Sequence, residues 1–347
     1  MLIKKIIELF EPQFNSRSKK NVIGKPCNDI PWLSKSLGFT QLGDTCSESL
    51  VLNQKIFQIN FLKLIDSIEQ VDSKLCFELI HDAFDLAYRN NEKNLELEKI
   101  LFYHLHNPNL FEHLNFINNF PNSKILYLFR NPIQMIESWV LSDLNELRNT
   151  QNFFKSIELI RNITNKICYP FELLNNPINS LYENRVRGVK LEDIKKKLNI
   201  TIPIISNWIG IKKNNNLFKS EFMNKKFSRP SYNFDNISGF DTRAIEVPIG
   251  KFFGNQDIQI LETLLWPFLK NYGYTKKSKT EFTKNLDKIK PLLGQPLEFE
   301  LKLKKQKIFK NKNIHKIEAF KKMHQQFFEA HQLLTEKNTY PHIMRPL

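Results

Sequence analysis

Apolar residues recur every three or four positions along much of the chain, which is the spacing of a helix with one buried face. The spacing predicts a helix over 57–68 and another over 74–88, where Leu75, Leu79 and Phe84 fall on one side. The same pattern predicts further helical segments over 2–10, 109–120, 152–169, 201–208, 256–272 and 317–334, and from 280 onward. We therefore expect a chain rich in amphipathic helices.

Short runs of β-forming residues alternate with these helices. One run covers 99–108 and a second covers 125–129. A third begins at Gly188 and leads into a helix with Glu192 and Asp193 in its first turn. Strands that alternate with helices favour a parallel sheet with helices on its faces, so the expected fold class is α/β.

Two boundaries follow from residue chemistry. Thr201 is predicted to cap the start of the helix over 201–208, and Gly210 is predicted to end it. Residues 212–243 are polar and basic. We expect them to form a long loop over the functional site.

The stretch from Lys124 to Val140 predicts a strand, a turn and a helix start. Arg130 closes the run of β-forming residues, and Pro132 stands where a first helical residue is expected. Ser138 follows within two turns of that start. A guanidinium, a hydroxyl and the positive end of a helix together form a site for a doubly charged oxyanion such as phosphate.

Charge and composition narrow the class of protein. The chain has 347 residues, 41% of them hydrophobic, and 51 Lys and Arg against 36 Asp and Glu. The length and the apolar content predict a globular protein, and the basic balance favours phosphorylated, sulfated or nucleic-acid partners. The first ten residues are too charged for an export signal and no segment has membrane-spanning length. We expect a cytoplasmic protein with no membrane partner.

Cysteine and histidine spacings give no indication of a metal site. The four cysteines form no close pair such as C-x-x-C, which argues against a zinc ribbon. His324 and His331 lie seven positions apart on one apolar stripe, so we expect them to pack in the core. The Lys-rich stretch 302–312 has few aromatic residues between its charges, which disfavours a nucleic-acid groove.

Three blocks of residues resemble the sulfotransferases that use 3′-phosphoadenosine-5′-phosphosulfate, and among them the bacterial members with a long C-terminal extension. The first block is Phe120 to Pro132 with Ser138 following. The second is His104-Leu-His106-Asn-Pro108, and the third is the strand and helix pair from Gly188 to Gly210. With Trp266 to Tyr274 and Thr339 to His342, the likeness covers about residues 95–347.

The resemblance implies a P-loop-NTPase-like parallel sheet flanked by helices, with a helical C-terminal extension. It divides the chain into an appendage over 1–21, a sulfotransferase-like domain over 22–275 and the extension over 276–347, packed on the domain. Transfer of a sulfonate group from the donor to a hydroxyl acceptor, a carbohydrate or a small molecule, is the activity implied. No metal is implied, and the sequence names neither the acceptor nor the oligomeric state.

The same resemblance assigns residues to roles. Arg130 and Ser138 match the pair that holds the donor's 3′-phosphate. His106 matches the catalytic base, with His104 as the alternative, because the unperturbed pKa of histidine suits removal of a hydroxyl proton near pH 7. Lys25 and Arg229 are further candidates for binding the donor's phosphate groups.

The first loop departs from the family pattern. Members carry a glycine-containing loop, often Gly-x-Pro-Arg-Ser-Gly-Thr, that cradles the 5′-phosphosulfate. The nearest segment here, 24–33, keeps the first Gly and the Pro of that pattern but lacks its Arg, its Ser, its second Gly and its threonines. Asp29 brings a carboxylate to that loop, and Pro31 removes an amide donor. Two alternatives therefore stand beside the enzyme: a catalytically inactive homologue that binds a nucleotide or a partner, and a basic module for an acidic polysaccharide or nucleic acid.

Overall fold

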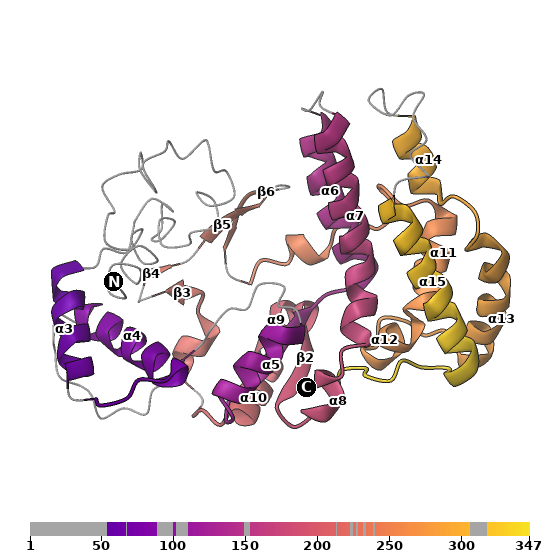
Figure 1. Ribbon diagram of the computed structural model, residues 1–347. Helices are drawn as coiled ribbons and strands as arrows, with labels where there is room; N and C mark the ends of the chain where they lie inside the picture. The colour runs from indigo at the N-terminus through magenta and orange to yellow at the C-terminus, as the bar shows by residue number, and fades with distance from the viewer. Residues whose placement is uncertain are drawn as a thin grey trace. The chain divides into compact units, whose positions relative to one another are not determined.

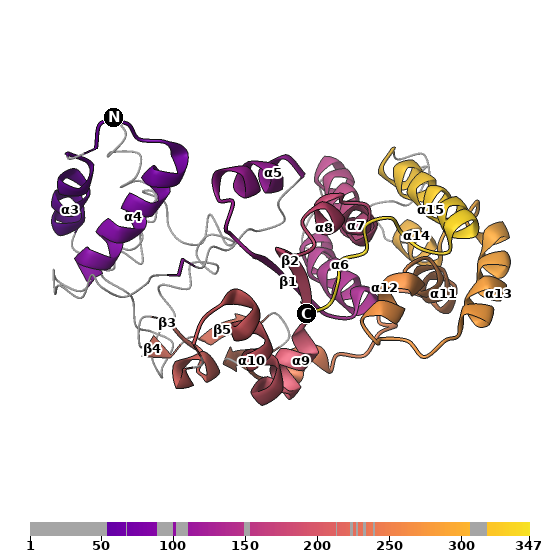
Figure 2. The same cartoon turned by 90° about the horizontal axis from the view of Figure 1, so that it is seen from below.

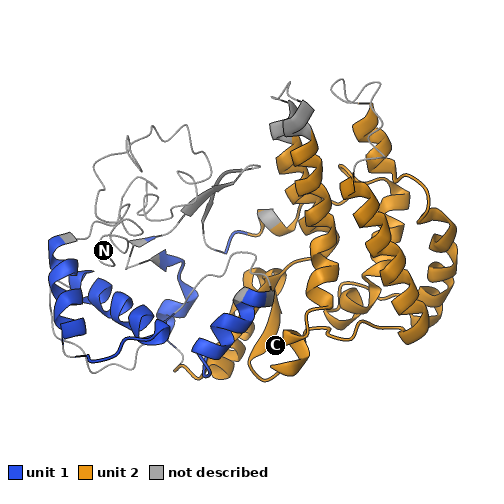
Figure 3. Cartoon of the chain, in the orientation of Figure 1, with its two compact units in different colours: residues 1–123, 213–241 blue, residues 124–212, 242–347 orange. Residues whose placement is uncertain are grey.

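The computed structural model describes residues 54–66, 68–88, 100–101, 110–148, 153–212, 214–222, 225–226, 228–231, 234–238, 240–305 and 318–347. The chain divides into two compact units (Figure 3). Unit 1 comprises 1–123 and 213–241, and unit 2 comprises 124–212 and 242–347. The segment 213–241 thus interrupts unit 2 in the sequence but belongs to unit 1.

Unit 1 contains a helix pair, α3 (Gln54–Asp66) and α4 (Ser73–Tyr88). Phe57 and Phe61 of α3 share one apolar cluster with Leu79 and Ala83 of α4, which confirms the two helices that the spacing predicts. The other described elements of unit 1 are α5 (Leu110–Asn119), the 3₁₀-helix η2 (Asn215–Phe218), β3 (Glu221–Phe222), β4 (Lys225–Lys226), β5 (Ser228–Ser231) and β6 (Phe234–Ser238).

Unit 2 is organised around two parallel strands, β1 (Ile125–Phe129) and β2 (Val186–Lys190), which run side by side (Figure 2). Ile125 pairs with Val186 and Phe129 with Lys190, so the strands end level with each other. The C-terminal segment extends this pairing. Gly188 N donates to Arg345 O at 3.0 Å and Leu347 N donates to Gly188 O at 2.8 Å.

Helices make up most of unit 2 (Figure 1). They are α6 (Pro132–Arg148), α7 (Phe153–Leu174), α8 (Ile178–Leu181), α9 (Leu191–Lys196), α10 (Leu198–Ile209), η3 (Arg243–Ile245), α11 (Asn255–Leu264), α12 (Trp266–Asn271), α13 (Lys279–Ile289), η4 (Lys290–Leu292), α14 (Glu298–Lys304) and α15 (Glu318–Lys337). The long helix α7 packs against both α6 and α15.

Aromatic side chains join these helices into one core. Phe171 of α7 lies 5.5 Å from Phe327 of α15, measured between ring centroids. Phe129 at the end of β1 lies 5.3 Å from Phe268 of α12, again between ring centroids. All four of these side chains are buried, so hydrophobic burial connects the C-terminal helices to the strand that precedes the predicted anion site.

The described fold is mostly helical with a small parallel sheet, which agrees with α/β as the coarse class. The strand–turn–helix at 125–148 and the strand and helix around Gly188 are where the sequence predicts them. Gly210 ends α10 with a left-handed φ of 93°, also as predicted. Of the predicted strand over 99–108, only 100–101 are described, and they belong to no helix or strand.

Two boundaries differ from prediction. Thr201 lies inside α10 rather than at its cap, because the helix begins at Leu198 and the Thr201 hydroxyl donates instead to Asp193 O at 3.1 Å. The single helix predicted over 256–272 is two helices, α11 and α12. Pro267 in the first turn of α12 has no backbone N–H with which to continue α11.

The segment 212–243 is also not a loop. Its described residues include two antiparallel strand pairs, β3 with β4 and β5 with β6, in which backbone N–H and C=O groups bond from one strand to the other. In the part of the chain that the structure describes, no helix is long and apolar enough to cross a membrane.

Candidate functional site

The turn between β1 and α6 is closed by the side chain of Asn131. Its Oδ1 accepts hydrogen bonds from the backbone N–H groups of Ile133 at 3.0 Å and Gln134 at 3.3 Å. Pro132 at the first helical position contributes no N–H. The free amides at the start of α6 are therefore satisfied within the chain by an N-cap.

Arg130 folds back along the first turns of α6. Its Nη2 donates to Gln134 O at 2.7 Å. In an α-helix the carbonyl of residue i faces the amide of residue i+4, so Gln134 O is directed towards Ser138. The guanidinium of Arg130 thus lies against the turn of α6 that carries Ser138, which is only partly buried.

A carboxylate from α9 completes the surroundings of Arg130. Glu192 accepts from Asn131 N through Oε1 at 3.1 Å and from the Tyr274 hydroxyl through Oε2 at 2.7 Å. Burial lowers the pKa of Arg130, while the charge of Glu192 and the nearby Tyr274 oppose that shift. Arg130 remains a cation at neutral pH, because arginine is not deprotonated in proteins.

Burial also raises the pKa of Tyr274, and the negative charge of Glu192 adds to the rise. Tyr274 is consequently a neutral hydrogen-bond donor in the pH range in which proteins are stable. Lys190, at the end of β2, lies over the same tyrosine ring at 5.6 Å from its centroid. Its ammonium group is also 3.2 Å from Asp193 Oδ2. Each strand end thus has a cation with a carboxylate nearby: Arg130 with Glu192 after β1, and Lys190 with Asp193 at the end of β2.

Two buried side chains of α6 hold a loop against the helix. Gln134 Nε2 donates to the carbonyls of Ile245, at 3.2 Å, and Val247. The carboxylate of Glu137 is 2% exposed and accepts from the backbone N–H groups of Gly250, Phe252 and Phe253 at 2.7 to 3.1 Å. Gly250 has a φ of 101°, a left-handed conformation that glycine adopts without strain.

This loop brings a lysine to the site. Lys251 lies between two residues whose amides bind Glu137, and its side chain is exposed. Glu137 directly precedes Ser138 in α6. The backbone on both sides of Lys251 is therefore anchored to Glu137, the residue before Ser138, and the Lys251 side chain is exposed to solvent.

The predicted site residues divide into three groups. Arg130 follows β1 and hydrogen-bonds the carbonyl of Gln134, one turn of α6 before Ser138, and Lys251 lies in the loop that Glu137 holds. His104, His106 and Lys25 lie outside the described residues, as does the predicted helix over 2–10. Arg229 lies in β5 of unit 1, and its side chain is not among those described.

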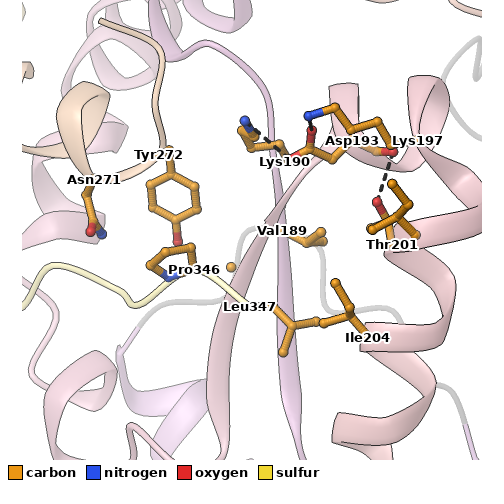
Figure 4. A pocket seen from close by; sticks show the side chains of 12 residues that line it. Val189, Lys190, Asp193, Lys197, Thr201, Ile204, Asn271, Tyr272, Pro346 and Leu347 are labelled. Carbon is orange, nitrogen blue, oxygen red and sulfur yellow. Dashed lines mark hydrogen bonds and ion pairs between the residues drawn. The ribbon is translucent and has the colours of Figure 1, made fainter. Parts of the chain in front are cut away.

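A pocket of about 310 Å³ is lined by residues of β2, α9, α10, α12 and the C-terminal segment (Figure 4). Asp193 is its central charge, with the ammonium groups of Lys190 at 3.2 Å and Lys197 at 3.3 Å. Tyr272 and Pro346 line the opposite wall. Tyr272 donates to Met344 O at 3.2 Å, so the wall is fixed by the C-terminal segment.

Sequence patterns could not have indicated several of these residues. Glu137 and Gly250 are 113 positions apart, and Glu192 and Tyr274 are 82 positions apart. Polar residues at 134, 137 and 138 in the otherwise apolar first turns of α6 are the one local signal, since a buried carboxylate needs partners. No protein-family model, curated protein or solved structure matches this chain.

Proposed function

We propose that the chain is a sulfotransferase-like protein that binds the 3′-phosphate end of 3′-phosphoadenosine-5′-phosphosulfate and transfers its sulfonate group to a hydroxyl acceptor. The observation that carries the proposal is the hydrogen bond from Arg130 to the carbonyl of Gln134 in α6, one helical turn before Ser138. The pair matches in spacing the phosphate-holding pair that the resemblance implies. His106 is the proposed general base, and the acceptor is a carbohydrate or a small molecule.

The residues present fit a phosphate at this position. Arg130 offers a partly buried guanidinium, Ser138 a hydroxyl and Lys251 an exposed ammonium group. Charge-assisted hydrogen bonds of this kind are shorter and stronger than those between neutral groups. Because Asn131 already caps the first amides of α6, the phosphate is held by side chains rather than by the helix amides.

The surrounding architecture supports the finer fold assignment. We infer a P-loop-like sheet of which β1 and β2 form a parallel part, with α6 following β1 directly. Ligands of open α/β sheets bind outside the carboxyl ends of the strands. Arg130 and Lys190 stand at those ends.

Calorimetric titration with two nucleotides tests the phosphate site. The wild-type chain should bind adenosine 3′,5′-bisphosphate more tightly than adenosine 5′-monophosphate, because only the first carries the 3′-phosphate. Arg130→Ala should reduce the affinity for the bisphosphate to that for the monophosphate, a loss of about tenfold or more for one charge-assisted contact. Arg161→Ala, which removes an exposed arginine of α7, is the matched control and should bind as wild type does.

Two results would reject the phosphate site: no bisphosphate binding by the wild-type chain, or equal binding by Arg130→Ala. Circular dichroism of each variant separates a lost contact from a lost fold. Turnover is measured separately with labelled donor and a pool of glycans and small hydroxyl compounds. A His106→Ala variant that transfers label as fast as wild type would exclude His106 as the base.

A second candidate function is a catalytically inactive homologue that binds the nucleotide or a partner. The position of Glu192 favours it, because this carboxylate accepts the Asn131 amide directly beside Arg130 and offsets part of the positive charge there. Nucleotide binding without transfer of label would select this candidate. Glu192→Gln should then tighten bisphosphate binding, since it removes a negative charge next to the proposed phosphate position.

A further inference from the structure

Helix α10 buries two polar residues and exposes two isoleucines. Thr201 and Ser206 are buried, whereas Ile200 is 63% exposed and Ile204 is 46% exposed. Isoleucine is among the residues most often found in protein interiors. The two partly exposed isoleucines, one turn apart, form an apolar stripe on the outside of α10, beside the pocket that they line with Leu347.

The buried hydroxyls explain why α10 can sit this way round. Thr201 Oγ1 donates to Asp193 O at 3.1 Å, and Ser206 Oγ donates to Ile202 O at 2.8 Å. Both are satisfied, so burying them carries no unpaired-group penalty. The exposure of the isoleucines is therefore not explained by unsatisfied polar groups on the buried side of α10.

Lysines stand at both ends of this stripe. Lys196 and Lys197 precede α10 with side chains 52% and 61% exposed, and the exposed Lys212 follows it. Trp208 lies in the last turn, with Lys124 Nζ at 5.5 Å from its ring centroid. The two isoleucines of the stripe thus lie between exposed lysines, with one partly exposed indole in the last turn of the helix.

Neighbouring carboxylates only partly neutralise the lysines. Lys197 lies 3.3 Å from Asp193 and Lys196 lies 3.7 Å from Glu246. Ion pairs this exposed contribute little, because water and salt screen them. Lys197, Ile200 and Ile204 also line the pocket beside β2 (Figure 4), so a hollow adjoins the stripe.

We propose that the exposed face of α10, comprising Lys196, Lys197, Ile200, Ile204 and Trp208, docks on an anionic lipid bilayer. A helix with an apolar face between cationic ends lies in the plane of the membrane, with its apolar residues among the upper acyl chains and its lysines at the phosphates. Tryptophan is enriched at that boundary. The charge of the frame selects anionic over zwitterionic lipid, which departs from the expectation of no membrane partner.

Co-sedimentation with vesicles tests the proposal on the full chain. Vesicles of phosphatidylserine and phosphatidylcholine in equal parts should retain the protein, and pure phosphatidylcholine vesicles should not. Lys196→Gln/Lys197→Gln should weaken binding roughly 30-fold, since each lysine near an anionic surface contributes about fivefold. The control Lys288→Gln/Lys290→Gln removes the same charge from an exposed part of α13 and η4, and it should bind as wild type does.

The apolar contribution has its own pair of variants. Ile200→Asp/Ile204→Asp should abolish retention, whereas Leu181→Asp, at a residue of α8 that is 72% exposed, should not. All of these positions are exposed, so the variants should fold, and circular dichroism verifies it. Equal retention of Ile200→Asp/Ile204→Asp and wild type would overturn the proposal.

A second copy of the chain is the competing occupant of this face. Analytical ultracentrifugation without lipid distinguishes the two. A monomer agrees with lipid docking. A dimer that Ile200→Asp/Ile204→Asp dissociates would show that the face is an interface between copies, and the lipid proposal would then be wrong.

Discussion

Glu137 is the residue that most directly ties the candidate site to the rest of unit 2. A carboxylate that is 2% exposed would be costly to bury alone, because an isolated charge loses its hydration. Three backbone N–H groups of the loop 250–253 replace that hydration. The same hydrogen bonds fix the loop that carries Lys251, so the buried carboxylate both stabilises unit 2 and holds this loop in place.

Replacement of Glu137 by Gln should lower the free energy of unfolding by about 2–3 kcal/mol, since hydrogen bonds to a charged acceptor are among the stronger ones. The NH₂ group of the new side chain would also face the backbone N–H groups of the loop, and two donors cannot bond each other. Urea unfolding measures the change. Glu158→Gln, at an exposed position of α7, is the control and should leave the midpoint unchanged. Equal stability of Glu137→Gln and wild type would mean that the loop is held by other contacts.

Local residue chemistry reached only part of the site. The placement of Arg130 at a strand end and of Ser138 in the following helix could be predicted, because the β-forming run, the proline at the first helical position and the serine lie within one short segment. Glu192 could not, because its contact with Asn131 depends on β1 and β2 being parallel neighbours in register. No helical or strand periodicity encodes which carboxylate reaches which amide across a sheet.

At the scale of elements, β2 packs so closely that its central residue has no room for a side chain. A Cβ on Gly188 would lie 2.0 Å from the Tyr272 hydroxyl and 2.6 Å from Phe129 Cε2. Gly188→Ala should therefore lower the free energy of unfolding by about 2–3 kcal/mol, the usual cost of overpacking a core. Thermal or urea unfolding checks this expectation.

Two further variants locate the cause of that loss. Gly294→Ala should change stability by less than about 0.5 kcal/mol, because its nearest contact would be Phe328 Cζ at 3.8 Å. Tyr272→Phe in the Gly188→Ala background removes the closest clashing atom and should recover part of the loss. If the double variant is no more stable than Gly188→Ala, the clash with the hydroxyl is not the cause.

Helices α14 and α15 are joined by a histidine and a carboxylate, which sequence spacing did not indicate. His324 Nε2 lies 2.6 Å from Glu300 Oε1, and His324 Nδ1 lies 3.0 Å from Leu293 O. A carbonyl only accepts, so Nδ1 must donate. With Glu300 ionised, Nε2 donates too and the ring is an imidazolium.

Burial by itself lowers the pKa of His324, but the hydrogen bond and charge of Glu300 and the Leu293 carbonyl together raise it above its usual value of 6.5. A histidine whose pKa is higher in the folded state stabilises the fold fully below the unfolded pKa. It loses that contribution as the pH rises through the folded pKa. The stability that His324 confers should therefore decline above pH 6.5.

Urea unfolding of wild type and His324→Gln from pH 6 to pH 9 measures this decline. The difference in free energy of unfolding should be largest at the acidic end and should narrow as the pH rises. His342→Gln, at a partly exposed position outside the helices, controls for the loss of one histidine. A difference that stays constant across the range would contradict a charged His324.

Elements with strong periodicity were predicted well, and those decided by a single residue or by pairing were not. The apolar stripe of 256–272 continues across Pro267, so spacing alone predicts one helix where the missing N–H makes two. The segment 212–243 is polar enough for a loop, yet β5 and β6 pair through Ser228 and Ser238. Polar strands of this kind are specified by backbone pairing, which leaves no mark on hydrophobic spacing.

At the scale of the whole molecule, the two compact units have separate cores and should unfold in separate steps. Three of the four tryptophans, Trp139, Trp208 and Trp266, belong to unit 2, and Trp32 belongs to the segment 1–123 of unit 1. In a Trp32→Phe variant, tryptophan fluorescence therefore reports on unit 2 alone. Far-ultraviolet ellipticity reports on the helices of both units.

Adenosine 3′,5′-bisphosphate should shift only the fluorescence transition of Trp32→Phe in urea, because Arg130, Ser138 and Lys251 all lie in unit 2. At a concentration 100 times its dissociation constant, the nucleotide should add about 2.7 kcal/mol to the stability of that unit. The second transition, seen by ellipticity, should stay in place, and Arg130→Ala should remove the shift. If both transitions move together, the units unfold as one cooperative body, and the ligand then stabilises the chain as a whole rather than the unit that holds its phosphate.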